Sequence, residues 1–173
     1  MKNYFIVCFG LWFGAVCLFP VFGETKVFEN SKGELFRYNG ATQTLEVLRY
    51  FKDNGDDTVT DERTGLMWQQ DDDGKEYTHK SAIRFCENLS LAGFSDWHLP
   101  DIDALKTLLW KEKASRPYID TAFFPSARSN WYWSSSVHVS KSDKAWSVDF
   151  FNGNVSWHYQ AYEHYVRCVR SGK

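Results

Sequence analysis

The sequence predicts an α+β domain with antiparallel strands and two helices in the middle of the chain. Three observations support this fold class. Short β-rich segments separated by turn residues occupy about residues 45–69, apolar residues at helical spacing follow in 78–116, and alternating aromatic segments return in 131–170. Groups of strands that are separated in sequence from a group of helices are typical of α+β domains rather than of alternating α/β folds.

The first 23 residues have the layout of a secretory signal peptide. A lysine precedes an uncharged apolar run over 4–19, a proline ends the run, and cleavage is expected after Gly23. The run is shorter than the roughly 20 residues that a spanning helix needs. An uncleaved anchor and lipidation at Cys17 are alternatives, although Val16 is a poor residue to precede a lipidated cysteine. We therefore expect export to the periplasm or the cell surface of a bacterium.

Cleavage at this point would leave 173 − 23 = 150 residues, enough for one domain with a substantial core. We expect residues 24–50 to form an extension or short hairpin and residues 51–171 to form the domain, with no membrane span. The shortened chain has 19 basic and 22 acidic residues, so its net charge is 19 − 22 = −3. This charge gives no support to nucleic acid as a partner.

The strands of the first half are predicted from β-rich runs and turn residues. The turn "YNGA" at 38–41 predicts a short hairpin in the extension. The runs "LEVLRYF" at 45–51 and "TVTD" at 58–61 flank the turn "KDNGDD", which predicts a second hairpin. "TGLMWQQ" at 64–70 is typical of a buried extended segment, and "DDDGKE" at 71–76 of a solvated acidic loop.

Two helices are predicted in the middle of the chain. Thr78 can cap the first helix and Gly93 would end it. Its apolar face has four residues at helical spacing: Ala82, Phe85, Cys86 and Leu89. The second helix begins near Asp101 and ends before Pro117. Its apolar face consists of Ile102, Leu105, Leu108 and Leu109.

The segment "WYWSSSV" at 131–137 is predicted to be a strand. Alternation places Trp131 and Trp133 on one face and Tyr132 with Ser134 on the other. Its three consecutive serines lie in no Gly-x-Ser-x-Gly elbow. We therefore expect them to alternate between the faces of a sheet and to bond to neighbouring backbone, rather than to supply a nucleophile.

A hairpin and a last strand are predicted to follow. "KAWSVDFF" and "VSWHY" flank Asn152-Gly153, which is a strong hairpin signal. Alternation places Val155, Trp157 and Tyr159 on one side of the second strand of this hairpin. The run "HYVRCVR" at 164–170 predicts a final strand with one face that includes Val166 and Cys168.

Cys86 and Cys168 are the cysteines that follow the predicted cleavage site. Two cysteines in an exported protein predict one disulfide, which would close a loop of 168 − 86 = 82 residues. Two buried free thiols are a weaker alternative outside the cytosol. A metal pair is weaker still, because no Cys-x-x-Cys pattern or nearby histidine accompanies either cysteine.

The acidic segments do not match a known cation loop. An EF-hand alignment of "KDNGDDTVTDER" puts Lys52 at the first ligand position, Asp57 where glycine is needed and Arg63 at the twelfth position. Three adjacent acids at 71–73 are more typical of a solvated loop than of a metal site. No glycine-rich phosphate loop or dinucleotide fingerprint is present in the sequence either. We expect neither a metal nor a cofactor.

Five segments occur in one order between about Phe51 and Arg170: "DNGDDTVTDERTGLMW", "AIRFCENLSLAGFSDWHLP", "YWSSS", "DFFNGNV" and "YVRCVR". Together they resemble the bacterial Lcl C-terminal domain family, which is named after the end domain of a collagen-like surface adhesin. The resemblance implies a C-type-lectin-like fold, which formylglycine-generating enzymes share. The chain departs from the family pattern at His98, where arginine is usual, and it has no Gly-X-Y stalk.

The resemblance does not extend to the activities known for that fold. Calcium-dependent lectins use Glu-Pro-Asn or Gln-Pro-Asp and Trp-Asn-Asp triplets, and none of these occurs. Formylglycine generation needs a reactive cysteine pair, whereas Cys86 and Cys168 match structural positions of the fold. Five scattered histidines do not indicate a catalytic base. The resemblance therefore implies a binding role rather than catalysis.

We expect a non-enzymatic, adhesin-like domain that binds a glycan or an envelope or host protein. The candidate ligand-binding residues are Trp131, Trp157, His158 and Tyr159, because aromatic faces stack on sugars and on apolar peptide groups. The alternatives are an enzyme that acts on envelope or extracellular material and a purely structural envelope protein. Burial of the same tryptophans in the core is the competing interpretation of this aromatic content.

Overall fold

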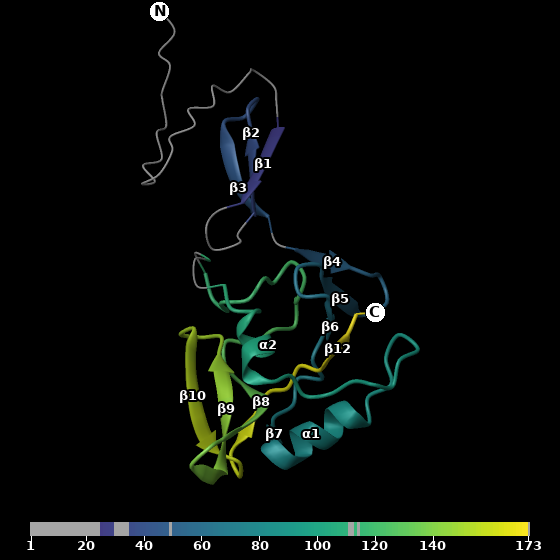
Figure 1. Ribbon diagram of the computed structural model, residues 1–173, viewed down its shortest axis with the longest axis vertical. Helices are drawn as coiled ribbons and strands as arrows, with labels where there is room; N and C mark the ends of the chain where they lie inside the picture. Colours follow the sequence, from purple (N-terminus) through teal and green to yellow (C-terminus); the bar gives the residue numbers. More distant parts are fainter. Residues whose placement is uncertain (1–24, 30–34, 49, 111–112, 114, 173) are drawn as a thin grey trace, which may run out of the picture. The chain divides into compact units, whose positions relative to one another are not determined.

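The computed structural model describes residues 25–29, 35–48, 50–110, 113 and 115–172 (Figure 1). The chain divides into two compact units, Met1–Arg49 and Tyr50–Lys173. The predicted signal peptide lies outside the described residues. Among the residues that are described, none of the helices has the length and apolar character to cross a membrane.

The first unit contains a three-stranded antiparallel sheet. Its strands are β1 (Thr25–Glu29), β2 (Leu35–Asn39) and β3 (Thr44–Leu48), in the order β1-β2-β3. The predicted hairpin at "YNGA" is confirmed, because the Asn39 side chain accepts hydrogen bonds from the backbone of Ala41 and Thr42 in the turn. The predicted strand over 45–51 is wrong, because this run is divided between β3 of one unit and the first strand of the other.

The second unit begins with a hairpin that becomes part of a four-stranded sheet. Its strands are β4 (Phe51–Asp53), β5 (Thr58–Asp61), β6 (Leu66–Gln69) and β12 (Val169–Ser171), in the order β12-β6-β5-β4. The hairpin predicted at "KDNGDD" is confirmed. Asn54 donates to the side chains of Thr58 and Thr60, so the turn is held by its own polar residues.

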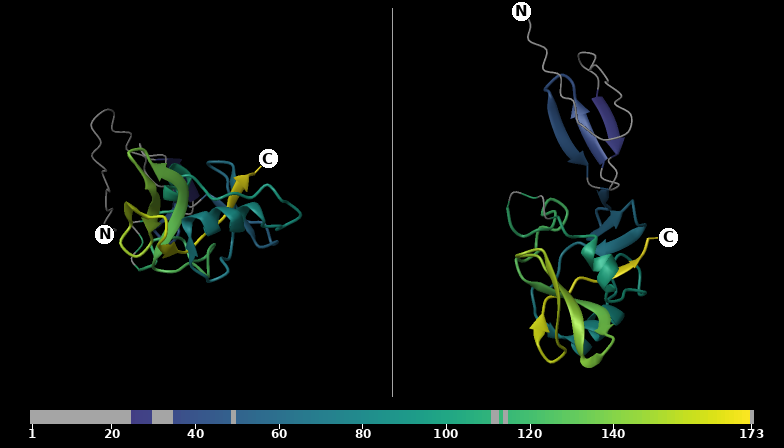
Figure 2. Two further views of the ribbon diagram at one scale, coloured as in Figure 1. Left: turned by 90° about the horizontal axis from the view of Figure 1, so that it is seen from below. Right: turned by 60° about the vertical axis from the view of Figure 1, so that its left-hand side comes forward.

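A second sheet is built from the aromatic segments near the end of the chain (Figures 1 and 2). Its strands are β8 (Trp131–His138), β9 (Lys141–Asp149) and β10 (Asn154–Tyr159), in the order β10-β9-β8. The turn predicted at Asn152-Gly153 joins β9 to β10, and Gly153 has a positive φ of 70° there. A further pair, β7 (Tyr77–Thr78) with β11 (Glu163–His164), lies at the start of the first helix.

Two helices separate the two groups of strands, as predicted, but both are shorter than expected. Helix α1 is His79–Glu87, with Thr78 at its N-cap and Asn88 at its C-cap. Gly93 does not end it, because this glycine lies in the turn closed by the Leu91–Phe94 pair. Helix α2 is Ile102–Lys106, and the Asp101 side chain caps it by accepting from the Ala104 N–H at 2.7 Å.

The final strand predicted over 164–170 is wrong. The chain forms β11 at Glu163–His164, leaves the ladder, and forms β12 only from Val169. The physical reason is Arg167, which is fully buried and donates from Nη1 to the backbone carbonyls of Gln69 and Gln70. Between β11 and β12 the chain passes from the β7–β11 pair to the four-stranded sheet, and the Arg167 side chain is buried in this passage.

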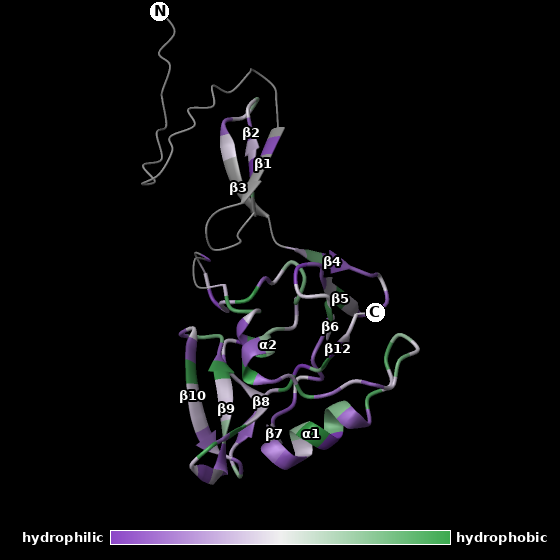
Figure 3. Cartoon of the chain, in the orientation of Figure 1, coloured by the Kyte–Doolittle hydropathy of each residue, from purple (hydrophilic) through white to green (hydrophobic). Residues whose placement is uncertain are grey.

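The core consists of two clusters of buried apolar residues. One cluster joins the four-stranded sheet to α2 and to Tyr132 and Val148 of the aromatic sheet. The other surrounds the disulfide and includes Ala82, Trp133 and Val166. Helix α1 shows both hydrophobic and hydrophilic residues in Figure 3, and its buried residues are His79, Ala82 and Cys86.

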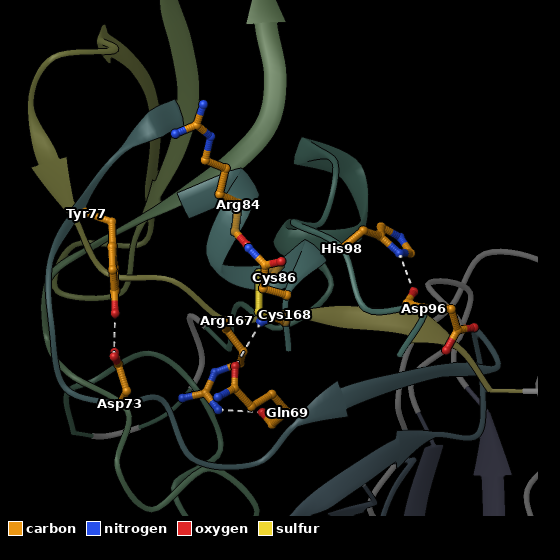
Figure 4. The surroundings of a disulfide bond; sticks show 10 residues. Gln69, Asp73, Tyr77, Arg84, Cys86, Asp96, His98, Arg167 and Cys168 are labelled. Carbon is orange, nitrogen blue, oxygen red and sulfur yellow. Dashed lines mark hydrogen bonds between the residues drawn. A yellow bond between two sulfur atoms is a disulfide. The ribbon is translucent and has the colours of Figure 1, made fainter. Parts of the chain in front are cut away.

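The predicted disulfide is confirmed. Cys86 of α1 and Cys168, just before β12, are bonded with a Cα–Cα distance of 5.4 Å across 82 residues of sequence (Figure 4). Both cysteines are fully buried. The mixed content, with antiparallel sheets and two helices between groups of strands, agrees with the predicted α+β class.

Candidate binding surface

The four predicted ligand-binding residues lie on opposite faces of the β8–β9–β10 sheet. Across the ladder, Trp131 pairs with Asp149 and His158 pairs with Ala145, which places these two side chains on one face. Trp157 and Tyr159 alternate with His158 along β10 and therefore point to the other face. The predicted set is thus divided between two surfaces, which have different chemistry.

The face that carries Trp131 is a cluster of histidine and tryptophan rings, which we call the histidine face: His79, His158, His164, Trp131, Trp133 and Ser147. The ring centroids are 4.5 Å apart for Trp131 and His158, and 4.3 Å apart for Trp133 and His164. Trp133 and Ser147 are fully buried, and His79 is nearly so. This face is mostly packed inside the domain.

Hydrogen bonds join the polar atoms of the histidine face. Nδ1 of His158 lies 2.8 Å from the Ser147 hydroxyl and 3.2 Å from Nε2 of His164. His79 donates from Nε2 to the carbonyl of Ser134 at 2.9 Å. Ser147 is fully buried, and its hydroxyl also donates to the Ser156 carbonyl at 3.3 Å.

Burial keeps these histidines neutral near pH 7. It is the largest cause that lowers the pKa of His164 to about 4, and the adjacent His158 lowers that pKa further. Burial also lowers the pKa of His158, against the opposing effect of Asp149. The pKa of His79 is lowered by burial as well. Within the described part of the chain, no group of three or more histidine, cysteine or acidic side chains converges to hold a metal ion.

The opposite face carries half-buried or exposed aromatic rings and two lysines. We call it the outer aromatic surface: His138, Lys141, Lys144, Trp146, Val155, Trp157 and Tyr159. The Nζ atom of Lys144 lies 3.9 Å from the Trp157 ring centroid and 4.3 Å from that of Tyr159. Nζ of Lys141 lies 4.3 Å from the Trp157 centroid. These are cation–π contacts, in which an ammonium lies over a ring face.

The outer aromatic surface is partly open to solvent, and Trp146 and Trp157 are half-buried. Tyr159 is 46% exposed and Val155 is 37% exposed, whereas Lys144 is only 8% exposed. The low exposure of Lys144 follows from its place between two rings, against which its apolar stem packs. His138 stacks on Trp146 at 5.8 Å beside them. The surface therefore offers flat apolar rings next to ammonium donors on a rigid sheet.

Two of the three serines of "WYWSSSV" bond to backbone through their side chains, as predicted for all three. Ser134 donates from Oγ to the Trp146 carbonyl at 2.8 Å, and Ser136 Oγ accepts from the Ile102 N–H at 3.0 Å. These bonds connect β8 to β9 and to the start of α2.

The segment "DDDGKE" is predicted to be a solvated acidic loop, and this prediction is wrong for one residue, Asp72. Its side chain is 2% exposed, accepts a hydrogen bond from the Tyr132 hydroxyl at 2.7 Å, and lies 3.4 Å from Nη2 of Arg167. Burial is the largest cause that raises the pKa of Tyr132. The positive charge of Arg167 compensates the burial of the Asp72 carboxylate. Arg167 is the first arginine of the segment "YVRCVR", and this arginine was the signal in the sequence that a buried acid lies nearby.

Position 98 contributes to the fold through its backbone. His98 exchanges two backbone hydrogen bonds with Val169, each of 2.9 Å, while its side chain is exposed. The nearby Asp96 binds Arg170 through two bonds of 2.7 and 3.1 Å, and this contact lowers the pKa of Asp96. Figure 4 shows His98 next to Asp96, whose backbone carbonyl lies 3.4 Å from Nδ1 of His98.

The sequence model of one family, described as the Lcl C-terminal domain, matches residues 57–170. This range contains β5 to β11, both helices, both cysteines of the disulfide and both faces of the aromatic sheet. No curated protein matches the chain at a significant level of similarity.

Proposed function

The chain belongs to the Lcl C-terminal domain family, and we propose that it acts as a non-enzymatic, adhesin-like binding domain. Its ligand is a glycan or another envelope or host protein. We propose further that the domain has a C-type-lectin-like fold and that it works in the periplasm or on the cell surface of a bacterium. The disulfide is compatible with an oxidising compartment, where such bonds persist.

The observation that carries this proposal is the outer aromatic surface. Trp157 and Tyr159 project from one strand, with Lys144 between their rings. Ring faces stack on the apolar faces of sugars and on apolar peptide side chains, and ammonium groups donate to hydroxyl or carboxylate oxygens. Because the residues stand on paired strands, little conformational entropy would be lost when a ligand binds.

The histidine face supports a binding role less well. Trp133, His79 and His164 of that face are buried, so at most the edge formed by Trp131 and His158 would meet a ligand. An enzyme would need an accessible nucleophile or base, and Ser147 beside His158 is fully buried. The outer aromatic surface is therefore our choice for the binding site.

A glycan array screened with the oxidised protein and with Trp157→Ala tests the proposal. We expect selective glycan binding that falls at least tenfold in the variant, because removal of a stacked ring typically costs more than 1 kcal/mol. Phe151→Ala is the matched control, since Phe151 is also an exposed aromatic residue, at 41%, but lies in the β9–β10 turn.

The variant Trp131→Ala distinguishes the two faces. Binding that survives Trp157→Ala and is lost in Trp131→Ala would move the site to the histidine face and contradict the surface proposed above. If the array is silent, a crosslinker placed at residue 159 should capture an envelope or host protein, and capture should fail in Trp157→Ala. A folded protein with neither ligand would leave the structural role as the better interpretation.

A further inference from the structure

The two edges of the aromatic sheet differ in what covers them. The outer edge of β8 is paired with other backbone: Trp133 N–H donates to Tyr165 O, Tyr165 N–H donates to Trp131 O, and Ser135 N–H donates to Pro100 O. These bonds measure 2.7–3.0 Å. At the opposite edge, β10 is the terminal strand of the sheet, as Figure 1 shows.

The register identifies which backbone groups of β10 point outward. Gln160 N–H donates to Asp143 O at 2.9 Å, so alternate residues 154, 156 and 158 face β9. The N–H and C=O groups of Val155 and Trp157 then point away from the sheet. Throughout the described ranges, no hydrogen bond reaches these groups, whereas the Tyr159 carbonyl accepts from the Tyr162 N–H at 2.9 Å.

The sequence of β10 has none of the usual features that prevent edge pairing. Natural edge strands carry lysine or other charges, proline, or bulges, because an open edge templates the addition of another strand. β10 reads "NVSWHY", which contains no lysine, arginine, acid or proline. Its register with β9 is continuous from Asn154 to Tyr159. The edge is therefore regular, uncharged and unprotected.

We infer that β10 pairs antiparallel with β10 of a second copy of this chain, about a two-fold axis at Trp157. In this register Trp157 pairs with its counterpart, and the Tyr159 N–H donates to the Val155 carbonyl of the other copy. Both of these pairs use the outward-pointing groups. The two three-stranded sheets become one continuous sheet, and the contact is isologous, as in most symmetric dimers.

Side chains match in this register as well as backbone. Val155 lies opposite Tyr159 of the other copy, and Trp157 lies opposite Trp157, all on the outer aromatic surface. Ser156 lies opposite His158 on the other face, and Asn154 lies opposite Gln160. Every pair joins apolar with apolar or polar with polar, and no like charges are opposed.

The exposed Val155 and Tyr159 side chains would gain a neighbour. This match within a single strand favours a second copy over an unrelated peptide.

Residue-resolved amide hydrogen exchange tests the pairing on the unmodified protein. Between about 1 μM and about 1 mM, a range that spans weak association, sedimentation should shift towards twice the monomer mass. Over the same range the outward amides of Val155, Trp157 and Tyr159 should become protected. The inward amides of Ser156 and His158 should stay protected at both concentrations, because β9 already binds them.

Val155→Pro provides a second, independent test. Proline removes one outward N–H and places a ring at the edge without removing a bond to β9. We expect this variant to be monomeric at the highest concentration, while Val155→Thr, which keeps the N–H, still associates. Circular dichroism and the melting temperature check that both variants fold.

The outcomes are distinct from those of the glycan screen. Sedimentation and hydrogen exchange are measured on the protein without ligand, so they report the pairing of β10 whether or not a glycan binds. A wild-type protein that stays monomeric to about 1 mM, with outward amides that exchange freely, would overturn the inference. A dimer that keeps those amides unprotected would overturn it too, because the contact would then lie elsewhere.

Discussion

His158 and His164 face each other on the inner side of the aromatic sheet, with 3.2 Å between Nδ1 of His158 and Nε2 of His164. One ring must donate and the other must accept, so the contact holds while at least one imidazole is neutral. The two side chains come from β10 and β11, and the Trp131 and Trp133 rings lie against them. Protonation of both rings would replace this hydrogen bond with repulsion.

The domain should lose stability as the pH falls from about 6.5 towards 4. The folded state lowers the pKa of His164 to about 4, so the unfolded chain binds the proton more tightly. A histidine with a lowered pKa contributes stability that is complete above its unfolded value of about 6.5 and is lost below it. The loss for His164 is on the order of 3 kcal/mol at pH 4. Chemical denaturation at a series of pH values measures it.

The variant His164→Phe checks the source of this pH dependence. It should flatten the fall in stability between pH 6.5 and 4, since phenylalanine does not titrate. The control is His98→Gln, which changes an exposed histidine outside the cluster and should keep the wild-type slope. An unchanged slope in His164→Phe would show that another group is responsible.

Removal of the Cys86–Cys168 disulfide should destabilise the domain strongly. The bond closes a loop of 82 residues, for which the chain-entropy model gives roughly 4–5 kcal/mol as an upper figure. The double variant Cys86→Ser with Cys168→Ser should melt well below the oxidised protein and match the wild type under reducing conditions. Mass mapping of an unreduced digest should recover the linked peptides. Two alkylatable thiols in the native protein would contradict the assignment.

Asp72→Asn should lower the melting temperature far more than Asp96→Asn, although each substitution neutralises an aspartate paired with an arginine. Asp72 and Arg167 are both buried, so loss of the carboxylate leaves a buried cation, at a cost of about 3 kcal/mol. The carboxylate of Asp96 is 59% exposed, and an exposed partner contributes little. Melting temperatures of the two variants, measured side by side, decide this. Equal effects on the melting temperature would mean that the Asp72–Arg167 pair is as accessible to solvent as the Asp96–Arg170 pair.

Calcium and chelators should leave the melting temperature unchanged. The aspartates at 71–73 already accept hydrogen bonds from the protein: Asp71 from the Ser126 N–H, Asp72 from the Gly74 N–H and Asp73 from the Lys75 N–H. Asp73 also accepts from the Tyr77 hydroxyl at 2.5 Å. A bound ion would stabilise the folded state by mass action. A shift of several degrees with calcium would reveal a site at these residues.

The sequence predicts local structure well where the signal is local. Alternation along "WYWSSSV" places Trp131 and Trp133 opposite Tyr132, and the sheet register agrees. Asp101 lies at the start of α2 and caps it. Gly93 misleads because a glycine with positive φ suits a tight turn as well as a helix end. Only the pairing of Leu91 with Phe94 decides between the two.

The histidine face could not be predicted, because its members come together through long-range pairing. His79 begins α1, while His158 and His164 lie on β10 and β11. The pairing of β11 with β7 brings these elements to one place, and no local pattern encodes it. The separation of Trp157 from His158 follows from alternation alone, but which face stays exposed depends on what packs against the sheet.

The last seven described residues complete both halves of the core. Val166 and Cys168 belong to the cluster around the disulfide, and Val169 to the other cluster. A nascent chain that ends before these residues has neither a complete four-stranded sheet nor a partner for Cys86. We expect the second unit to stay unfolded until residues 166–172 have been synthesised, and a protease that removes only these residues to unfold all of it.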